Sequence, residues 1–352
     1  MATLIYKCPN CGAVLEYNAE SAKMTCDHCR STFSVEEAQR AAEVQSEPED
    51  QGAQTAADIQ FEKDVVSYTC SSCGAQILTD ANTSATFCTF CGAPTILPSQ
   101  LSGVYRPALV IPFKVSKKEA QETFLKWCKN GRYTPKDFAS PQELEKLTGI
   151  YVPFWLFDCG VESNMTAQAS RVNSYVAGNY MVRRTRNYVI RRRARMQFDK
   201  VPADGSARMD DPTMDLLEPY DYTELKAFEM PYLAGFQAEK YDVEPKKVFS
   251  RIRERIDEYA KSKIRESVIG YTSVSNTGLH TNYYNTNATY ALLPVWIHRY
   301  RYKDKVYQFS MNGQTGKVVG EPPVDKGRVW RQFFALAAGI IGALFLGGML
   351  LL

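Results

Sequence analysis

Eight of the ten cysteines in this 352-residue chain form two sets with the same spacing. In each set, two cysteines separated by two residues are followed, after fourteen residues, by a second such pair. The first set is Cys8, Cys11, Cys26 and Cys29, and the second is Cys70, Cys73, Cys88 and Cys91. Paired thiolates at this spacing reach one tetrahedral Zn²⁺ from a tight turn, and a second pair closes the four-coordinate shell. The spacing therefore predicts two zinc ribbons, each with a closed structural metal site.

The two ribbons are an internal repeat. A shift of 62 residues, from Cys8 to Cys70, superposes all eight cysteines and also places Gly12 on Gly74. Each glycine directly follows the first cysteine pair, where a turn that points backbone amides at the sulfurs often needs a positive φ. We therefore expect a left-handed turn in both copies.

Disulfides and a redox pair are the alternatives for these cysteines. The N-terminus lacks an apolar signal sequence, which favours a reducing cytosol where disulfides rarely persist. A module of roughly 35 residues also buries too little apolar surface to fold alone, whereas structural zinc contributes on the order of 10 kcal/mol. His28 could replace a cysteine, but four thiolates suffice, so we expect it to be solvated. Cys128 and Cys159 stand in apolar surroundings and are predicted to be small buried hydrophobes.

The C-terminal residues 333–352 contain no charged or strongly polar side chain. A helix of this length covers roughly 30 Å, the thickness of the hydrocarbon layer of a bilayer. Lys326, Arg328 and Arg331 precede it and would stay in the cytoplasm. These features predict a single C-terminal transmembrane helix, a tail anchor, in the cell membrane, with the N-terminal domains cytoplasmic. Small residues at four-residue spacing would allow two such helices to associate within the membrane. The alternative to a transmembrane helix is a helix buried in the protein core.

Composition between these features indicates a multidomain chain. The net charge is +3, and 45% of the residues are hydrophobic. The predicted parts are zinc ribbon 1 at 1–40, an acidic flexible linker at 41–65, zinc ribbon 2 at 66–98, an α+β cytoplasmic domain at 104–327 and the tail anchor at 333–352. We expect the ribbons to be mobile relative to each other because the linker has little apolar surface.

The α+β domain is expected to hold a largely antiparallel sheet with helices on one face. Helical periodicity predicts its longest helix at 245–267, with Val248, Ile252, Ile256 and Tyr259 on the buried face. Other expected elements are a helix at 117–129, a capping box at 140–143, strands at 151–159, 268–274 and 292–302, a polar loop at 276–290 and a tight hairpin turn at Asn312-Gly313.

An arginine cluster interrupts this domain. It consists of Arg183, Arg184, Arg186, Arg191, Arg192, Arg193 and Arg195. As an extended ribbon it would carry arginines on both faces, which suits anionic headgroups or nucleic acid. The alternative is neutralisation by an acidic segment folded back onto it. That segment contains Asp204, Asp210, Asp211, Asp215, Glu218 and Asp221.

No arrangement of residues indicates catalysis, so we expect a protein that is not an enzyme. The chain has three histidines, no nucleophile elbow and no metalloprotease helix. Residues 313–317 (GQTGK) differ from a phosphate-binding loop in glycine spacing, and a hairpin cannot provide the helix N-terminus that such a loop requires.

Several motifs together resemble one bacterial family. They are CPNCG, CSSCG, GIYVPFWLFDC, MPYLAGFQAEKYDV, LLPVWIHRYRY and NGQTGKVVG. The chain resembles the YdjG-type, TFIIB-like zinc-ribbon membrane proteins, many of which carry a label as PriA-like primosomal helicases. The resemblance implies a zinc-ribbon adaptor at the membrane, associated in some members with PspA-like and SPFH proteins of the envelope stress response. It implies no catalytic residues, and the absent P-loop gives the helicase label no support.

Two function classes remain: a membrane-anchored protein-interaction adaptor and a nucleic-acid-binding ribbon protein. Nucleic-acid binding requires Lys or Arg to neutralise phosphates, and residues 65–105 contain neither. Four thiolates around Zn²⁺ also carry about two negative charges, which repel phosphate. We therefore expect protein partners, contact with membrane lipid and no nucleic acid. Apolar residues such as Ile77, Leu78, Ile96 and Leu97 could cover the surface of a partner, although some of them must pack their own hairpins.

Overall fold

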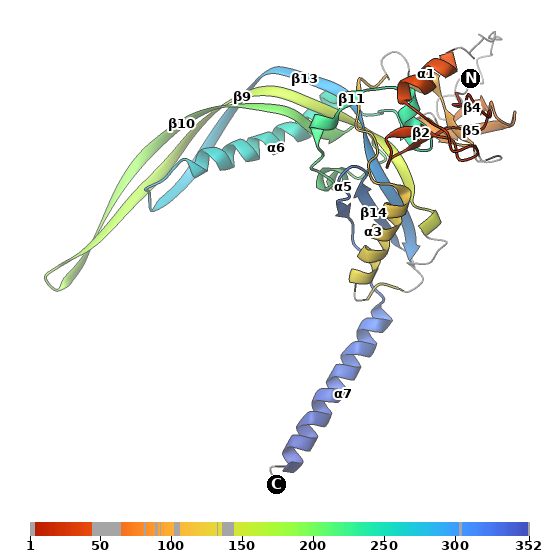
Figure 1. The fold of residues 1–352 in the computed structure, drawn as a ribbon. Helices are drawn as coiled ribbons and strands as arrows, with labels where there is room; N and C mark the ends of the chain where they lie inside the picture. Colours follow the sequence, from red (N-terminus) through yellow and green to blue (C-terminus); the bar gives the residue numbers. More distant parts are fainter. Residues whose placement is uncertain are drawn as a thin grey trace.

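The computed structural model describes residues 4–43, 65–80, 82–88, 91, 93–101, 106–131, 133–135, 144–302 and 305–350. Most of the predicted acidic linker and the capping box at 140–143 lie outside this part of the chain. Figure 1 shows a sheet-rich body near the N-terminus, a long curved arm of strands, and a C-terminal helix that points away from both.

The N-terminal region forms two small sheets. The first contains β1 (Glu16–Asn18), β2 (Lys23–Thr25) and β3 (Thr32–Phe33), followed by helix α1 (Val35–Glu43). The second is a hairpin of β4 (Val65–Thr69) and β5 (Gln76–Asp80). The next hairpin, β6 (Thr83–Phe87) with β7 (Pro94–Ile96), belongs to the main sheet.

The main sheet has ten strands, and most of its pairs are antiparallel. Its central order is β11-β8-β13-β9-β12-β6-β7, with β10 beside β9 and the β14–β15 hairpin beside β13. The remaining strands are β8 (Leu109–Val110), β9 (Thr148–Ala177), β10 (Tyr180–Asp204), β11 (Lys226–Ala227), β12 (Gln237–Glu239), β13 (Ser273–Tyr302), β14 (Lys305–Asn312) and β15 (Val318–Val319). The helices are η1 (Pro98–Leu101), α3 (Lys117–Asn130), α5 (Asp211–Leu216), η4 (Tyr222–Glu224), η5 (Met230–Leu233), α6 (Pro245–Glu266) and α7 (Lys326–Leu350).

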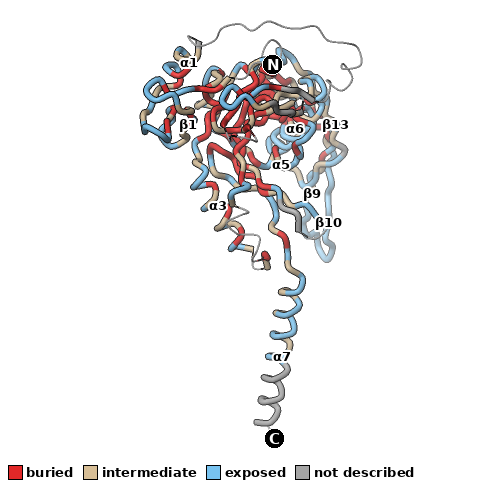
Figure 2. The backbone as a smooth tube through the Cα atoms, turned by 90° about the vertical axis from the view of Figure 1, so that its right-hand side faces the viewer, coloured by how far each residue is buried: buried red, intermediate tan, exposed pale blue. Residues whose placement is uncertain are grey.

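Strand β9 divides the core into two halves because successive side chains of a strand point to opposite faces. Tyr151, Trp155 and Phe157 belong to the larger core, together with residues of α3 and α6. Ile150, Val152 and Phe154 belong to a second core with Met214 of α5. Helices therefore lie on both faces of the sheet, and the expectation of one covered face is wrong. Figure 2 shows this buried region at the centre of the body.

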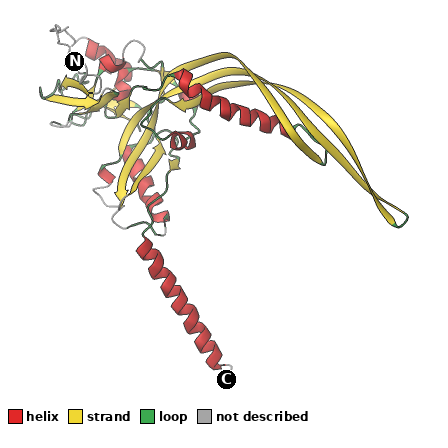
Figure 3. Cartoon of the chain, turned by 180° about the vertical axis from the view of Figure 1, so that it is seen from behind, coloured by secondary structure: helices red, strands yellow, loops and turns green. Residues whose placement is uncertain are grey.

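Three strands continue past the body as the arm (Figures 1 and 3). Strands β9 and β13 have 30 residues each and β10 has 25. The predicted polar loop at 276–290 is part of β13, so that prediction is wrong. The sequence did not predict this strand because neither face of the outer arm carries a continuous row of apolar side chains, which is the pattern that indicates a strand.

Helix α6 forms where the apolar periodicity predicts a helix. It lies along the arm (Figure 1). Val248, Ile252, Ile256, Ala260 and Ile264 are buried. Tyr259 was expected on this face but is half exposed, because Ala260 takes the buried position. The helix thereby supports β9 and β10 over the inner part of the arm.

The predicted hairpin at Asn312-Gly313 forms between β14 and β15, but its turn is longer than two residues. The amide of Asn312 donates to the carbonyl of Lys317 at 2.9 Å, and the amide of Gly316 donates to the carbonyl of Asn312 at 2.9 Å. The Asn312 side-chain oxygen accepts from the amides of Gln314 and Thr315. Gly316, with φ of 74°, takes the left-handed position instead of Gly313.

The predicted transmembrane helix requires correction. No helix in the described part of the chain is both long enough and apolar enough to cross a membrane. This finding contradicts the tail anchor and the single-pass membrane location. The predicted self-association within a membrane required a membrane-spanning helix and therefore loses its basis.

Candidate metal centres

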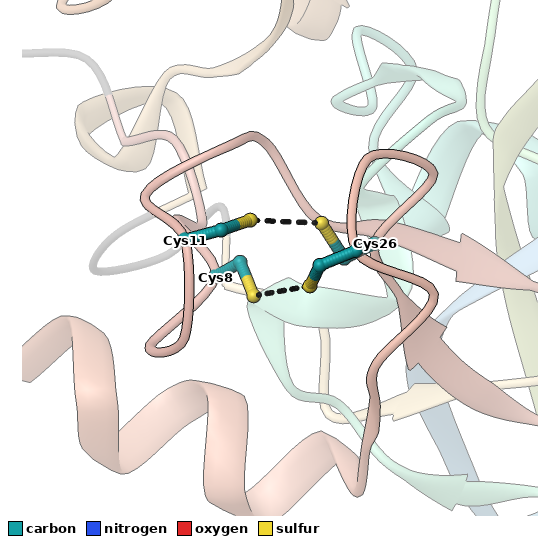
Figure 4. Close-up of side chains that lie close together, drawn as sticks. Cys8, Cys11 and Cys26 are labelled. Carbon is teal, nitrogen blue, oxygen red and sulfur yellow. Dashed lines mark hydrogen bonds between the residues drawn. The ribbon is translucent and has the colours of Figure 1, made fainter.

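The first cysteine set comes together at the ends of two turns. The Sγ atoms of Cys8 and Cys29 are 3.5 Å apart, as are those of Cys11 and Cys26. All four sulfurs lie within 4.8 Å of one another, and Figure 4 shows Cys8, Cys11 and Cys26 pointing into one space. Zn–S bonds of about 2.3 Å in a tetrahedron separate the sulfurs by roughly 3.8 Å. The cluster therefore has the size of a four-thiolate metal site.

The second set repeats this geometry. The Sγ atoms of Cys70 and Cys91 are 3.9 Å apart, and those of Cys73 and Cys88 are 3.7 Å apart. These four sulfurs also lie within 4.8 Å of one another. Two four-cysteine clusters that could each hold a metal ion are thus present in the structure.

The predicted left-handed glycines are confirmed in both copies. Gly12 has φ of 75° and Gly74 has φ of 72°. Each glycine amide donates to the carbonyl of the first cysteine of its pair at 2.8 Å. The amide of that cysteine in turn donates to the carbonyl of Ala13 or Ala75. These short-range bonds bend the chain so that both thiols of a pair face the same point.

The second turn of ribbon 1 uses a residue that the sequence did not indicate. Arg30 has φ of 60°, and its amide donates to the carbonyl of Cys26 at 2.8 Å. It occupies the same position after its cysteine pair as Gly12 does after the first, which is the signal that could have identified it. His28 is exposed and does not belong to the cluster.

Electrostatics within the first set link metal binding to proton release. Hydrogen bonds with Ser31 lower the pKa of Cys29 to about 6. A backbone hydrogen bond with Ala13 lowers the pKa of Cys11, but burial and the neighbouring thiols together outweigh it and raise that pKa to about 12. A metal ion must therefore displace protons that the set holds at neutral pH, so its affinity falls as pH falls.

The two ribbons contact each other. Ile5 and Val14 of ribbon 1 pack with Tyr68 and Leu97 of ribbon 2. A backbone bridge joins Leu4 to Ile96, with N–O distances of 3.0 and 3.1 Å. The expectation that the ribbons move independently is therefore wrong, because the residues around the metal clusters share one small core.

Both ribbons are also joined to the main sheet. Tyr17 of β1 donates its amide to the carbonyl of Ala234 at 2.9 Å and packs edge-on against Tyr232. Strand β6 pairs with β12 at Ala238 and Ala85. The metal clusters are thus set at one end of a continuous sheet.

This packing changes the predicted partner surface. Ile96 and Leu97 are buried, so of the two alternatives for these residues they take internal packing, in the contact between the ribbons. The side chains of Ile77 and Leu78 lie outside the part that the structure describes. Cys128 and Cys159 are buried as predicted.

A cavity of about 470 Å³, which the sequence did not reveal, opens where the modules meet. Its walls come from β1 of ribbon 1, Phe87 of β6, the start of α3, Trp296 of β13 and Phe236, the residue before β12. Burial raises the pKa of Glu16, which lines the cavity from the ribbon side, and Lys117 of α3 is also a lining residue. We call this cavity the junction recess.

Fold and clusters together define a sheet-rich protein in which two four-cysteine clusters lie in small ribbons that contact the main sheet. Over 346 residues the chain is 40% identical to a curated protein of Bacillus subtilis (strain 168), "Uncharacterized protein YdjG", covering 98% of both chains. The chain therefore belongs to the YdjG family. No protein-family model and no solved structure matches it.

Proposed function

We propose that this protein is a non-enzymatic zinc-ribbon adaptor that binds a protein partner at the junction recess. The main support is the closed donor set of each cluster: four cysteine sulfurs at tetrahedral spacing leave no open position for a substrate or water. A closed shell suits a structural ion. We assign Zn²⁺ because four soft thiolates in tetrahedral arrangement favour it.

The structural role of the metal extends to the recess in this proposal. The wall formed by Glu16, Tyr17 and Asn18 belongs to ribbon 1, and Phe87 precedes Cys88 of ribbon 2. Loss of either metal ion would therefore unfold the ribbon that forms one wall of the junction recess. Partner binding should depend on zinc although no partner atom contacts it.

The partner classes follow from the family resemblance: a PspA-like protein or an SPFH protein of the same organism. The alternative, nucleic-acid binding by the ribbons, is disfavoured because ribbon 2 contains no Lys or Arg to meet a phosphate.

The test uses the full chain and purified recombinant PspA-like and SPFH proteins. The native protein should contain two zinc ions per chain by elemental analysis and should bind one of the two partners. Lys117→Glu on the recess rim should weaken that binding at least tenfold. Lys118→Glu, one residue away, exposed and outside the recess, is the matched control.

Three outcomes would refute the proposal. They are a metal content near zero, equal effects of the two lysine substitutions, or partner binding that survives zinc removal. Salt-sensitive DNA binding that is lost with the zinc would favour the nucleic-acid alternative.

A further inference from the structure

The outer end of the arm is a two-stranded hairpin. Strands β9 and β10 pair continuously out to Ala177 and Tyr180, whereas the pairing of β13 with β9 begins only at Ser170. Helix α6 ends at Glu266, well before the tip (Figures 1 and 3). Gly270 and Thr272 still hydrogen-bond to Arg171 and Val172, so residues 173–184 project beyond the rest of the described chain.

The tip of this hairpin is apolar and exposed. The exposed fractions are 55% for Tyr175, 72% for Val176, 78% for Tyr180 and 78% for Met181. Single exposed apolar side chains are common on protein surfaces, but here the register places Tyr175 and Tyr180 on one face of the hairpin and Val176 and Met181 on the other, so the tip is apolar on both faces, which indicates an interaction site. Gly178, with φ of 62°, makes the turn that brings the four together.

A cationic zone follows directly behind the tip. No Asp or Glu occurs between Glu162 and Asp199, while eight arginines do. The acidic segment that was expected to neutralise them pairs elsewhere: Asp204, Asp211, Asp215 and Glu218 bind Arg251 and Arg255 of α6. The acidic segment therefore does not neutralise the arginines of the hairpin, and their positive charge is available to bind an anionic molecule.

Within the arm, only the inner arginines have carboxylate partners. Arg193 and Arg195 both pair with Glu162. Arg183, Arg184 and Arg186 form no ion pair with any residue that the structure describes. Register places Arg183 on one face and Arg184 and Arg186 on the other, as expected for an extended ribbon.

We propose that this hairpin is a peripheral contact site for an anionic lipid bilayer. The apolar tip would enter the interfacial layer, and Arg183, Arg184 and Arg186 would bind headgroup phosphates. At about 3.3 Å per residue, these arginines lie roughly 10 to 20 Å behind Tyr180, within one to two screening lengths of a surface that the tip touches.

The order of side chains along the hairpin selects lipid over nucleic acid. A bilayer presents acyl chains and then phosphates to a protein that enters it, and the hairpin presents apolar residues at its tip and arginines behind them. A duplex would satisfy the arginines but leave the four apolar side chains in water. The contact requires no membrane-spanning helix.

Vesicle sedimentation with the full chain tests this site. The native protein should bind vesicles of phosphatidylglycerol and phosphatidylcholine far better than vesicles of phosphatidylcholine alone. Each basic residue near such a surface contributes about a fivefold factor, so Arg183→Gln, Arg184→Gln and Arg186→Gln together should weaken binding roughly 100-fold. Tyr180→Ser with Met181→Ser should weaken it at least tenfold, since two exposed apolar side chains are lost.

Arg193→Gln with Arg195→Gln is the matched control, because these residues lie farther from the tip and already pair with Glu162. It should change vesicle binding less than threefold, and zinc content and circular dichroism should stay native in all variants. Absence of binding to anionic vesicles, or unchanged binding in the tip or triple-arginine variant, would overturn the proposal. So would tight binding to duplex DNA that depends on the arginines and not on Tyr180 and Met181.

Discussion

A buried ion-pair network at the base of the arm allows a quantitative test. Asp204, at the end of β10, accepts a hydrogen bond from Arg251 of α6 at 2.7 Å. Its side chain is 1% exposed, and its second oxygen has no hydrogen-bond partner among the described residues. Arg251 also contacts Asp211 and Asp215, so the network holds α6 against β10.

Two opposing effects act on the Asp204 carboxyl group. Burial favours its neutral form, whereas Arg251 favours the charged form. Burial is the stronger effect and raises the pKa of Asp204 from 3.8 to about 6. Between these values the folded protein holds a proton that the unfolded chain has released. The stability contributed by this group is therefore fully present below pH 3.8 and is lost as pH rises to about 6.

The magnitude follows from the shift of about two pKa units. At about 1.4 kcal/mol per unit, the wild type should lose about 3 kcal/mol of unfolding free energy across this interval relative to Asp204→Asn. We will compare the unfolding free energies of the two proteins by urea unfolding at pH 4 and pH 7. Relative to the wild type, Asp204→Asn should become more stable by that amount between the two pH values. Asp199→Asn, an exposed aspartate on the same strand, should show no such pH-dependent difference.

A second variant separates the two effects. Arg251→Met removes the attraction, so the pKa of Asp204 should rise further and the stability at pH 7 should fall by about 3 to 5 kcal/mol. Adding Asp204→Asn to that variant should recover part of the loss. A wild type that gains stability relative to Asp204→Asn as pH rises would show that the ion pair outweighs burial and would refute this reasoning.

Further predictions concern the metal clusters and the core. Zinc removal by a chelator should lower the unfolding midpoint of the whole body, measured by far-ultraviolet circular dichroism, because β6 pairs with β12; a change confined to the ribbons would contradict this. Gly12→Ala should lower the free energy of unfolding, measured with urea, by about 1 to 2 kcal/mol, because the φ of this residue is left-handed. The added methyl group itself would meet open space. An unchanged unfolding midpoint would contradict the left-handed turn. Phe113→Ala should cost about 3 to 5 kcal/mol in the same assay, because the ring is buried and stacks on Phe236 at 4.0 Å between centroids. A loss below 1 kcal/mol would mean that this core is poorly packed.

Short-range features were readable from the sequence. The cysteine spacing and the glycines at positions 12 and 74 act within one turn, so they predicted both sulfur clusters and their left-handed residues. Helix α6 was predicted nearly to its ends because apolar residues at three- and four-residue steps encode a single buried face. Only the choice between Tyr259 and Ala260 on that face needed the structure.

Long-range features were decided by tertiary structure. The acidic segment was considered only as a partner of the arginine cluster, and the packing of α5 and α6 instead pairs it with Arg251 and Arg255. The polar part of β13 became a strand through its pairing with β9, whose register no local pattern contains. Ile96 could have covered a partner or packed internally, and the bridge to Leu4 of the neighbouring ribbon buries it. Local spacing fixes what a few consecutive residues can bind. Burial and strand pairing depend instead on segments that are distant in the sequence, whose contacts exist only once the chain has folded.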